Sequence, residues 1–293
     1  MKNTPRKRAP LAFSRGPQKN DREQLLGFVE IWKSACADFV ALARTIPDDQ
    51  AHLPTDLAGW DVADNIAHTA HLEAVLAGAP EETVEVDAGE HVKAAHIKNV
   101  TGHYTEQGVL ARRGRSIAEL CDEIEDAVAR RYAELQADPP EDGSAPPPRT
   151  PGGVPWNTRT LLSNRPLDVW MHEQDIRRAI DRPGGFDSPA AAHTMRVFRG
   201  ALPMVLGKRV GAAPGTSVVI EIPLADMTFG AIVGDDGRAA PGVPDEPTTR
   251  ITLPPEAFVI LAGGRRTPDS VEAVIAGDAE LAGAVLASLA VTP

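Results

Sequence analysis

The spacing of apolar residues changes at the Arg182–Gly185 turn. Upstream, apolar side chains recur mostly every three or four residues, which is typical of amphipathic helices. Downstream, short runs rich in Val, Ile and Thr alternate with turn residues, which indicates strands. We therefore expect an α+β protein with a helical domain over residues 21–184 and a smaller C-terminal α+β domain over residues 185–293.

Four helices are expected in the N-terminal domain. They are a helix over residues 21–46, one that begins at the N-cap Asp61 and carries His68, one over residues 116–135 and one over residues 164–180. The stretch from residue 78 to 108 is less regular. Four helices with apolar faces suit an antiparallel bundle, in which a site is built between facing helices.

Residues 137–157 hold seven prolines and three glycines. A loop of this length is usually functional or a linker. Because it leads into the helix over residues 164–180, it is interpreted as a lid or wall of a site, with a surface insertion as the alternative.

The C-terminal domain is predicted to contain both element types. A helix over residues 188–206 precedes strands near residues 215–223, 227–233 and 248–253, and helices follow up to Leu261 and from Gly277 to Leu289. At the other end of the chain, residues 1–20 hold six basic residues and no acidic one, and are expected to form a disordered tail.

Charge and composition exclude several classes of function. The chain has 30 Lys and Arg against 41 Asp and Glu, a net charge of −11, which argues against nucleic acid or an anionic membrane as the main partner. Cys36 and Cys121 are too few for a disulfide framework or a thiolate zinc cluster. No apolar run reaches membrane-spanning length and no secretory signal is evident, so a cytoplasmic protein is expected. The oligomeric state stays open.

Three polar residues recur on one side of the helix over residues 164–180. Asp168, His172 and Asp175 follow one another at spacings of four and three. A carboxylate and an imidazole on adjacent turns suit zinc or another borderline metal, but catalytic zinc usually takes three protein ligands, and His68 is the candidate for the third. A solvated polar face or a hydrogen-bonded helix pair explains the spacing of Asp168 and His172 equally well, and spacing alone leaves both interpretations open.

Three separated motifs resemble the mycothiol-dependent maleylpyruvate isomerase family. The likeness runs from about residue 22 to the end of the chain and implies a DinB-like four-helix bundle that carries the metal site, followed by a domain similar to sterol carrier proteins. The motifs are Gly59-Trp60-Asp61-Val62 with His68, residues 168–175, and Gly264-Arg265-Arg266 with residues 277–281.

The resemblance implies a zinc ion held by His68, Asp168 and His172. Asp168 stands where the family commonly has glutamate, so the carboxylate arm is one methylene shorter; aspartate is nevertheless an ordinary zinc ligand. Asp175 is expected to orient His172 or a neighbouring ligand from outside the ligand set, with an ion pair to Arg178 as the alternative.

The family also implies an arginine in the C-terminal domain that binds a dicarboxylate substrate. Arg265 is the match, as a catalytic and binding residue, and Arg266 is a second candidate for binding the substrate or cosubstrate. Exposed turn arginines are the simpler alternative for both.

The implied activity is thiol chemistry at a zinc ion. A coordinated low-molecular-weight thiol, here mycothiol, is deprotonated and becomes a nucleophile. It would add to the double bond of a maleylpyruvate-like substrate and leave after rotation, or be transferred to an electrophile. A non-catalytic small-molecule or lipid-binding protein with a structural metal is the alternative, and a regulatory zinc module is disfavoured because neither cysteine lies near the proposed ligands.

Overall fold

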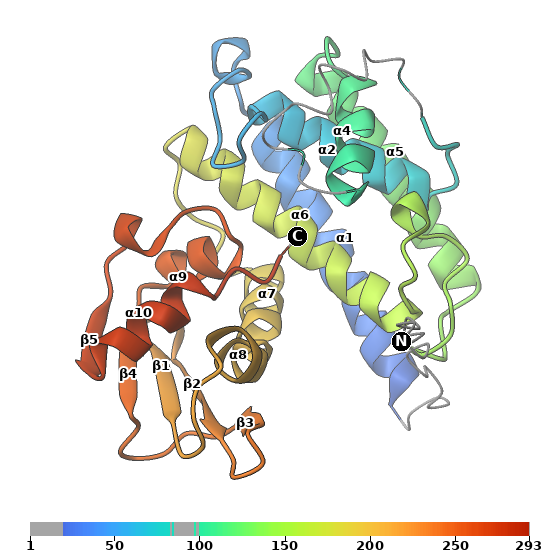
Figure 1. Cartoon of the computed structure of the whole chain (residues 1–293). Helices are drawn as coiled ribbons and strands as arrows, with labels where there is room; N and C mark the ends of the chain where they lie inside the picture. Colours follow the sequence, from blue (N-terminus) through green and yellow to red (C-terminus); the bar gives the residue numbers. More distant parts are fainter. Residues whose placement is uncertain (1–19, 83, 85–96, 98–99, 293) are drawn as a thin grey trace, which may run out of the picture.

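The computed structural model describes residues 20–82, 84, 97 and 100–292 (Figure 1). The expected tail over residues 1–20 therefore lies, except for Asn20, outside the described residues. The longer helices in chain order are α1 (Asp21–Ala43), α2 (Val62–Leu76), α4 (Val100–Leu110), α5 (Ile117–Ala137), α6 (Thr158–Ala179), α7 (Pro189–Gly200), α9 (Pro255–Ala262) and α10 (Ala279–Ala287). None of the described helices is long and apolar enough to span a membrane.

The helices of the first half pack around a shared apolar core. α1 packs against α5 and α6, and α2 packs against the same two helices and α4. Two predicted helix starts are present as capping boxes: the side chains of Asp61 and Ser116 each accept from the backbone N–H of the third helical residue, and their own backbone N–H groups donate to the side chain of that residue. α4 lies in a stretch that the sequence analysis left irregular, because its hydrophobic pattern is weak and only part of it is buried.

A five-stranded mixed sheet dominates the second half (Figure 1). Its strand order is β3-β2-β1-β4-β5, with β1 antiparallel to β2 and parallel to β4. The predicted strands correspond to β1 (Ser217–Ile222), β2 (Met227–Val233) and β4 (Thr249–Thr252). The edge strands β3 (Ala239–Pro241) and β5 (Val274–Gly277) were not predicted, because both are short and lack alternating buried residues.

The two halves meet along α6 and α7. The predicted helix over residues 188–206 ends at Gly200, and a short α8 (Leu202–Met204) and the π-helical turn η3 (Val205–Val210) continue it. α7 packs against both α1 and α6. After α10 the final segment returns to the end of α9, where Val291 donates to the Ala262 carbonyl. At Gly263 a Cβ atom would lie 2.4 Å from the Met171 methyl carbon, so glycine permits the close approach of the α9 end to α6.

The proline-rich loop contacts the ends of two helices. Gly143 donates to the Asp21 carboxylate at the start of α1, and Arg149 donates to the Leu76 carbonyl at the end of α2. The expectation that this loop forms a lid or wall of a site stays a prediction.

His71 is buried between α2 and α4. A Cβ atom at Gly108 would lie 2.1 Å from the imidazole, which explains why α4 has glycine there. The Arg112 Nη1 atom lies 3.3 Å from His71 Nδ1. Burial, together with the charge of Arg112, lowers the pKa of His71 to about 3, so the ring is neutral in the folded protein at neutral pH.

Acidification is expected to destabilise the protein through His71. Because the folded-state pKa lies below the unfolded value of 6.5, the unfolded state alone binds the proton between these values, and stability is lost as pH falls through that window. Urea unfolding should give about 2 kcal/mol less stability at pH 5.0 than at pH 7.5 from this residue. His71→Gln should reduce that pH dependence, and an unchanged dependence would contradict the assignment.

Candidate metal centre

Two helices bring the three predicted ligands together. His68 lies on α2, whose start is held by the Asp61 cap, while Asp168 and His172 lie one turn apart on α6. His68 Nε2 is 3.6 Å from Asp168 Oδ2, and His172 Nε2 is 3.8 Å from Asp168 Oδ1. One potential ligand atom from each residue lies within 4.8 Å of the others. This is a compact group of two imidazoles and one carboxylate.

The group is shielded but still reachable from solvent. His68 is 4% exposed and His172 5% exposed, whereas the Asp168 side chain keeps 23% of its surface accessible. The imidazole rings stand edge to face with centroids 4.6 Å apart. A small ligand can therefore approach from the Asp168 side while both histidines stay out of bulk water.

The protonation of His172 follows from its neighbours. Its Nδ1 atom lies 2.8 Å from Asn65 Oδ1 and 3.5 Å from Asp175 Oδ2. Both neighbours are oxygens that accept hydrogen bonds, so Nδ1 carries a proton. The Nε2 lone pair then points toward the Asp168 carboxylate. Two facing acceptors repel each other unless a cation lies between them, which is what a metal ion would provide.

The other two residues complete a donor set suited to a metal. Burial, followed by the neighbouring His172, lowers the pKa of His68 to about 4, so the His68 ring is neutral at pH 7. Burial raises the pKa of Asp168, but the Arg165 charge and the contact with His68 outweigh it and hold the pKa well below its usual range. Two imidazole nitrogens and one ionised carboxylate oxygen fit zinc or a similar divalent ion.

A buried charge network supports Asp168 from behind. Arg165 donates from Nη1 to Asp168 Oδ2 at 2.9 Å, and from Nε and Nη2 to Glu73 Oε1 at 3.0 and 2.7 Å. Arg131 contributes a further contact to Glu73 at 3.3 Å. Arg165 and Glu73 are 1% and 0% exposed. The sequence analysis missed them, although Arg165 precedes Asp168 by one helical turn and Glu73 is a carboxylate within an apolar helix.

Trp60 forms one side of the centre. Its ring centroid lies 4.9 Å from that of His68 and 6.0 Å from that of His172, and its Nε1 donates to Glu106 Oε2 at 2.7 Å. Trp60 directly precedes the Asp61 cap of α2, and its ring contacts both histidines, so it limits the access of water from that side.

The predicted arginines of the second half have different surroundings. Arg265 donates from Nε and Nη2 to the Asp175 carboxylate at 2.8–3.0 Å and from Nη1 to the Gly263 carbonyl, and its side chain is 7% exposed. Arg266 is 42% exposed and donates to Asp56. Arg265 thus connects the second half to α6, whereas Arg266 retains an accessible side chain.

Asp175 lies between Arg265 and His172 of the candidate metal centre. Burial raises its pKa, but the Arg265 charge and the nearby His172 ring outweigh burial, so the net pKa is lowered and the carboxylate is ionised. Arg178 also donates to Asp175 and, at 2.6 Å, to Asp56. The ion pair with Arg178 and the contact with His172, weighed as alternatives from the sequence, are both present.

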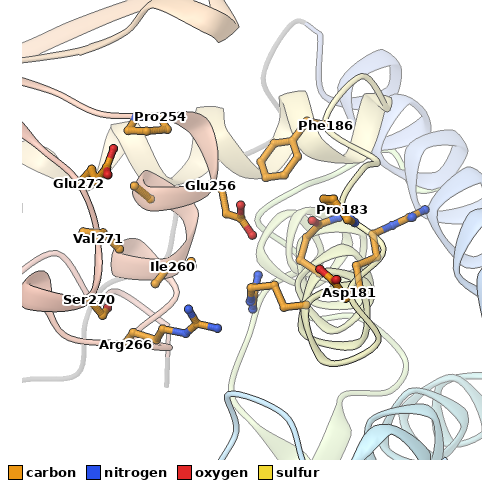
Figure 2. Close-up of a pocket in the computed structure, with 14 residues that line it drawn as sticks. Asp181, Pro183, Phe186, Pro254, Glu256, Ile260, Arg266, Ser270, Val271 and Glu272 are labelled. Carbon is orange, nitrogen blue, oxygen red and sulfur yellow. The ribbon is translucent and has the colours of Figure 1, made fainter. Parts of the chain in front are cut away.

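A pocket of about 410 Å³ opens beyond this ion-pair layer (Figure 2). It lies between the end of α6, the loop that follows it, the start of α9 and the segment around η5 (Pro268–Ser270). Its lining combines apolar and charged side chains, including Phe186, Ile260, Glu256 and Arg266. Arg178 separates the pocket from Asp175, so it is adjacent to the candidate metal centre but distinct from it.

The fold and the site define a helical domain with a buried histidine–carboxylate centre, joined to an α+β half. Residues 32–177 match the family described as "Mycothiol maleylpyruvate isomerase N-terminal domain", and the chain belongs to this family. No curated protein matches the chain.

Two similar crystal structures have been solved. One is the mycothiol-dependent maleylpyruvate isomerase, with 18% identity and a TM-score of 0.52, covering 85% of this chain and 92% of that one. The other is a histidine-to-alanine mutant of the mycothiol-dependent maleylpyruvate isomerase, with 17% identity and the same TM-score and coverage. At this identity the likeness describes the fold alone.

Proposed function

We propose that this protein is a zinc-dependent enzyme that activates a low-molecular-weight thiol, mycothiol, for reaction with a small unsaturated acid. The observation that carries the proposal is the convergence of two imidazoles and the Asp168 carboxylate within 4.8 Å. The family of the N-terminal domain supports the choice of thiol and of reaction.

Each residue of the centre has a role in this proposal. His68 and His172 present imidazole nitrogens from α2 and α6. Asp168 supplies a negative charge, because Arg165 keeps its carboxylate ionised. When bound, zinc with three protein ligands offers an open position at which a thiol ionises at neutral pH. Trp60 shields the histidines from water, which strengthens electrostatic interactions there.

Isomerisation is the favoured reaction. The ionised sulfur would add to the cis double bond of a maleylpyruvate-like substrate, and rotation followed by elimination would give the trans isomer and restore the thiol. The matched family and both similar structures carry the isomerase name, which supports this choice over S-transfer. S-transfer would use the same nucleophile, with the thiol kept in the product.

We also propose that the two halves are a DinB-like bundle and a sterol-carrier-like domain. The mutual packing of α1, α2, α5 and α6 supports a DinB-like bundle, and the mixed sheet with α9 and α10 supports a sterol-carrier-like second domain. The pocket between the halves contains three arginines and three acidic residues. A lining of this kind does not favour the alternative of a carrier for an apolar ligand.

The proposal is tested by metal content and thiol binding. Elemental analysis of the purified protein should give about one zinc per chain. Calorimetric titration of this protein should show heat with mycothiol and none with glutathione, and maleylpyruvate should isomerise only when mycothiol is present. Lack of metal after growth and purification with zinc would overturn the proposal.

The two arginines are expected to respond differently to substitution. Arg266→Ala should raise KM for a dicarboxylate substrate by roughly ten- to hundredfold, because it removes a charge-assisted hydrogen bond donor. Arg265→Ala should keep zinc but lower activity and stability, because Asp175 loses its bidentate partner. The exposed Arg238 provides the control, and Arg238→Ala should change neither KM nor stability. Loss of zinc from Arg265→Ala would contradict this division of roles.

A further inference from the structure

Asn65 is fully buried on α2, one turn before His68. Its Nδ2 atom donates to the Asp61 carbonyl at 2.8 Å and to Thr55 Oγ1 at 3.2 Å. A carbonyl oxygen can only accept, so the amino group of the amide must face Asp61. The Oδ1 atom is therefore turned toward His172, where it lies 2.8 Å from Nδ1. The orientation of the amide is set by the start of α2.

The other acceptor near His172 is less able to hold the ring. Asp175 Oδ2 lies 3.5 Å from Nδ1, beyond a good hydrogen bond, and the same carboxylate accepts from Arg265 and Arg178. Both oxygens of the carboxylate therefore already accept from cationic donors. The short contact to His172 comes from Asn65.

We propose that Asn65 is a positioning residue of the candidate metal centre, which keeps the His172 proton on Nδ1 and so presents the Nε2 lone pair to the metal. The inference rests on the metal assignment in the proposed function. Outer partners of this kind orient ligating histidines and fix their tautomer. Here α2 supplies both one ligand, His68, and the group that orients a ligand on α6.

The tautomer of His172 tests the inference without metal. Nitrogen-15 spectra of the metal-free protein should show His172 protonated at Nδ1. Asn65→Leu removes the acceptor and should shift the ring toward the Nε2-protonated form, whereas Asn65→Asp keeps an acceptor and should retain the original form. Thr69→Val is the matched control, because Thr69 is equally buried on α2 and its hydroxyl donates to the backbone carbonyl of Asn65 rather than to the His172 ring. It should leave the spectrum unchanged.

Metal affinity provides the second measurement. Competition titrations with Zn²⁺ and Co²⁺ should show a ten- to hundredfold weaker affinity for Asn65→Leu and less than a twofold change for Thr69→Val. If Asn65→Leu does not fold, Thr55→Val removes one of the two groups that orient the amide and should shift both readouts in the same direction by a smaller amount.

The outcomes separate this inference from the proposed function. An unchanged tautomer in the Asn65→Leu protein, or an unchanged spectrum in Thr55→Val if that protein is needed, would overturn the role of Asn65. Failure of the wild-type protein to bind either metal would overturn the proposed function and the metal part of the inference, while the nitrogen-15 spectra would still decide whether Asn65 sets the tautomer.

Discussion

His172→Ala and His68→Ala are each expected to abolish stoichiometric metal binding. Each substitution removes one of three donors that lie within 4.8 Å of one another, and two donors rarely hold such an ion. Because loss of an outer partner alone costs roughly ten- to hundredfold in affinity, loss of a ligand should cost more than about a hundredfold. Elemental analysis and titration with Co²⁺ measure the effect.

His193→Ala is the control for these variants. His193 is 3% exposed, much like His68 and His172, but it lies on α7 and contacts the Ser163 carbonyl. It should retain wild-type metal content even if its stability falls. Full zinc in either His68→Ala or His172→Ala would rule out the assignment of the centre.

Arg165→Met is expected to lower the free energy of unfolding by about 3–5 kcal/mol, because it leaves Glu73 buried without its main partner. Arg131 remains, but only with a 3.3 Å contact. Since each kcal/mol shifts Tm by roughly 2–4 °C in a protein of this size, calorimetry should show a decrease of about 10 °C. The loss of the contact with Asp168 should also weaken metal binding.

An exposed arginine gives the comparison for Arg165. Arg44 pairs with Asp122 and Glu125, but its side chain is 38% exposed. Arg44→Ala should change the free energy of unfolding by less than about 1 kcal/mol, because exposed ion pairs are solvated and screened. Equal losses in the two variants would show that burial of Glu73 does not determine the effect.

The amino-acid sequence was sufficient to predict much of the helical half. The apolar repeats of α1, α5 and α6 and the capping residues Asp61 and Ser116 are local signals, and their elements form close to the predicted bounds. The exception is the start of α6, which lies at Thr158, six residues before the predicted start, and leaves Pro166 inside the helix. The same local geometry places Asp168, His172 and Asp175 on one side of α6. The sequence did not predict α4, β3 and β5. These segments are short, their apolar residues show little periodicity, and they depend on their neighbours for stability.

The longer helices, their caps and the chemistry of the residues that they present follow from the amino-acid sequence, because they depend on contacts three or four positions apart. Which distant side chains become partners depends on how these helices pack. Arg265 meets Asp175 across 90 residues and Asn65 meets His172 across 107. Arg165 reaches Glu73 across 92. No periodicity encodes these pairs, since a buried charge or amide takes its partner from whichever helix packs against it.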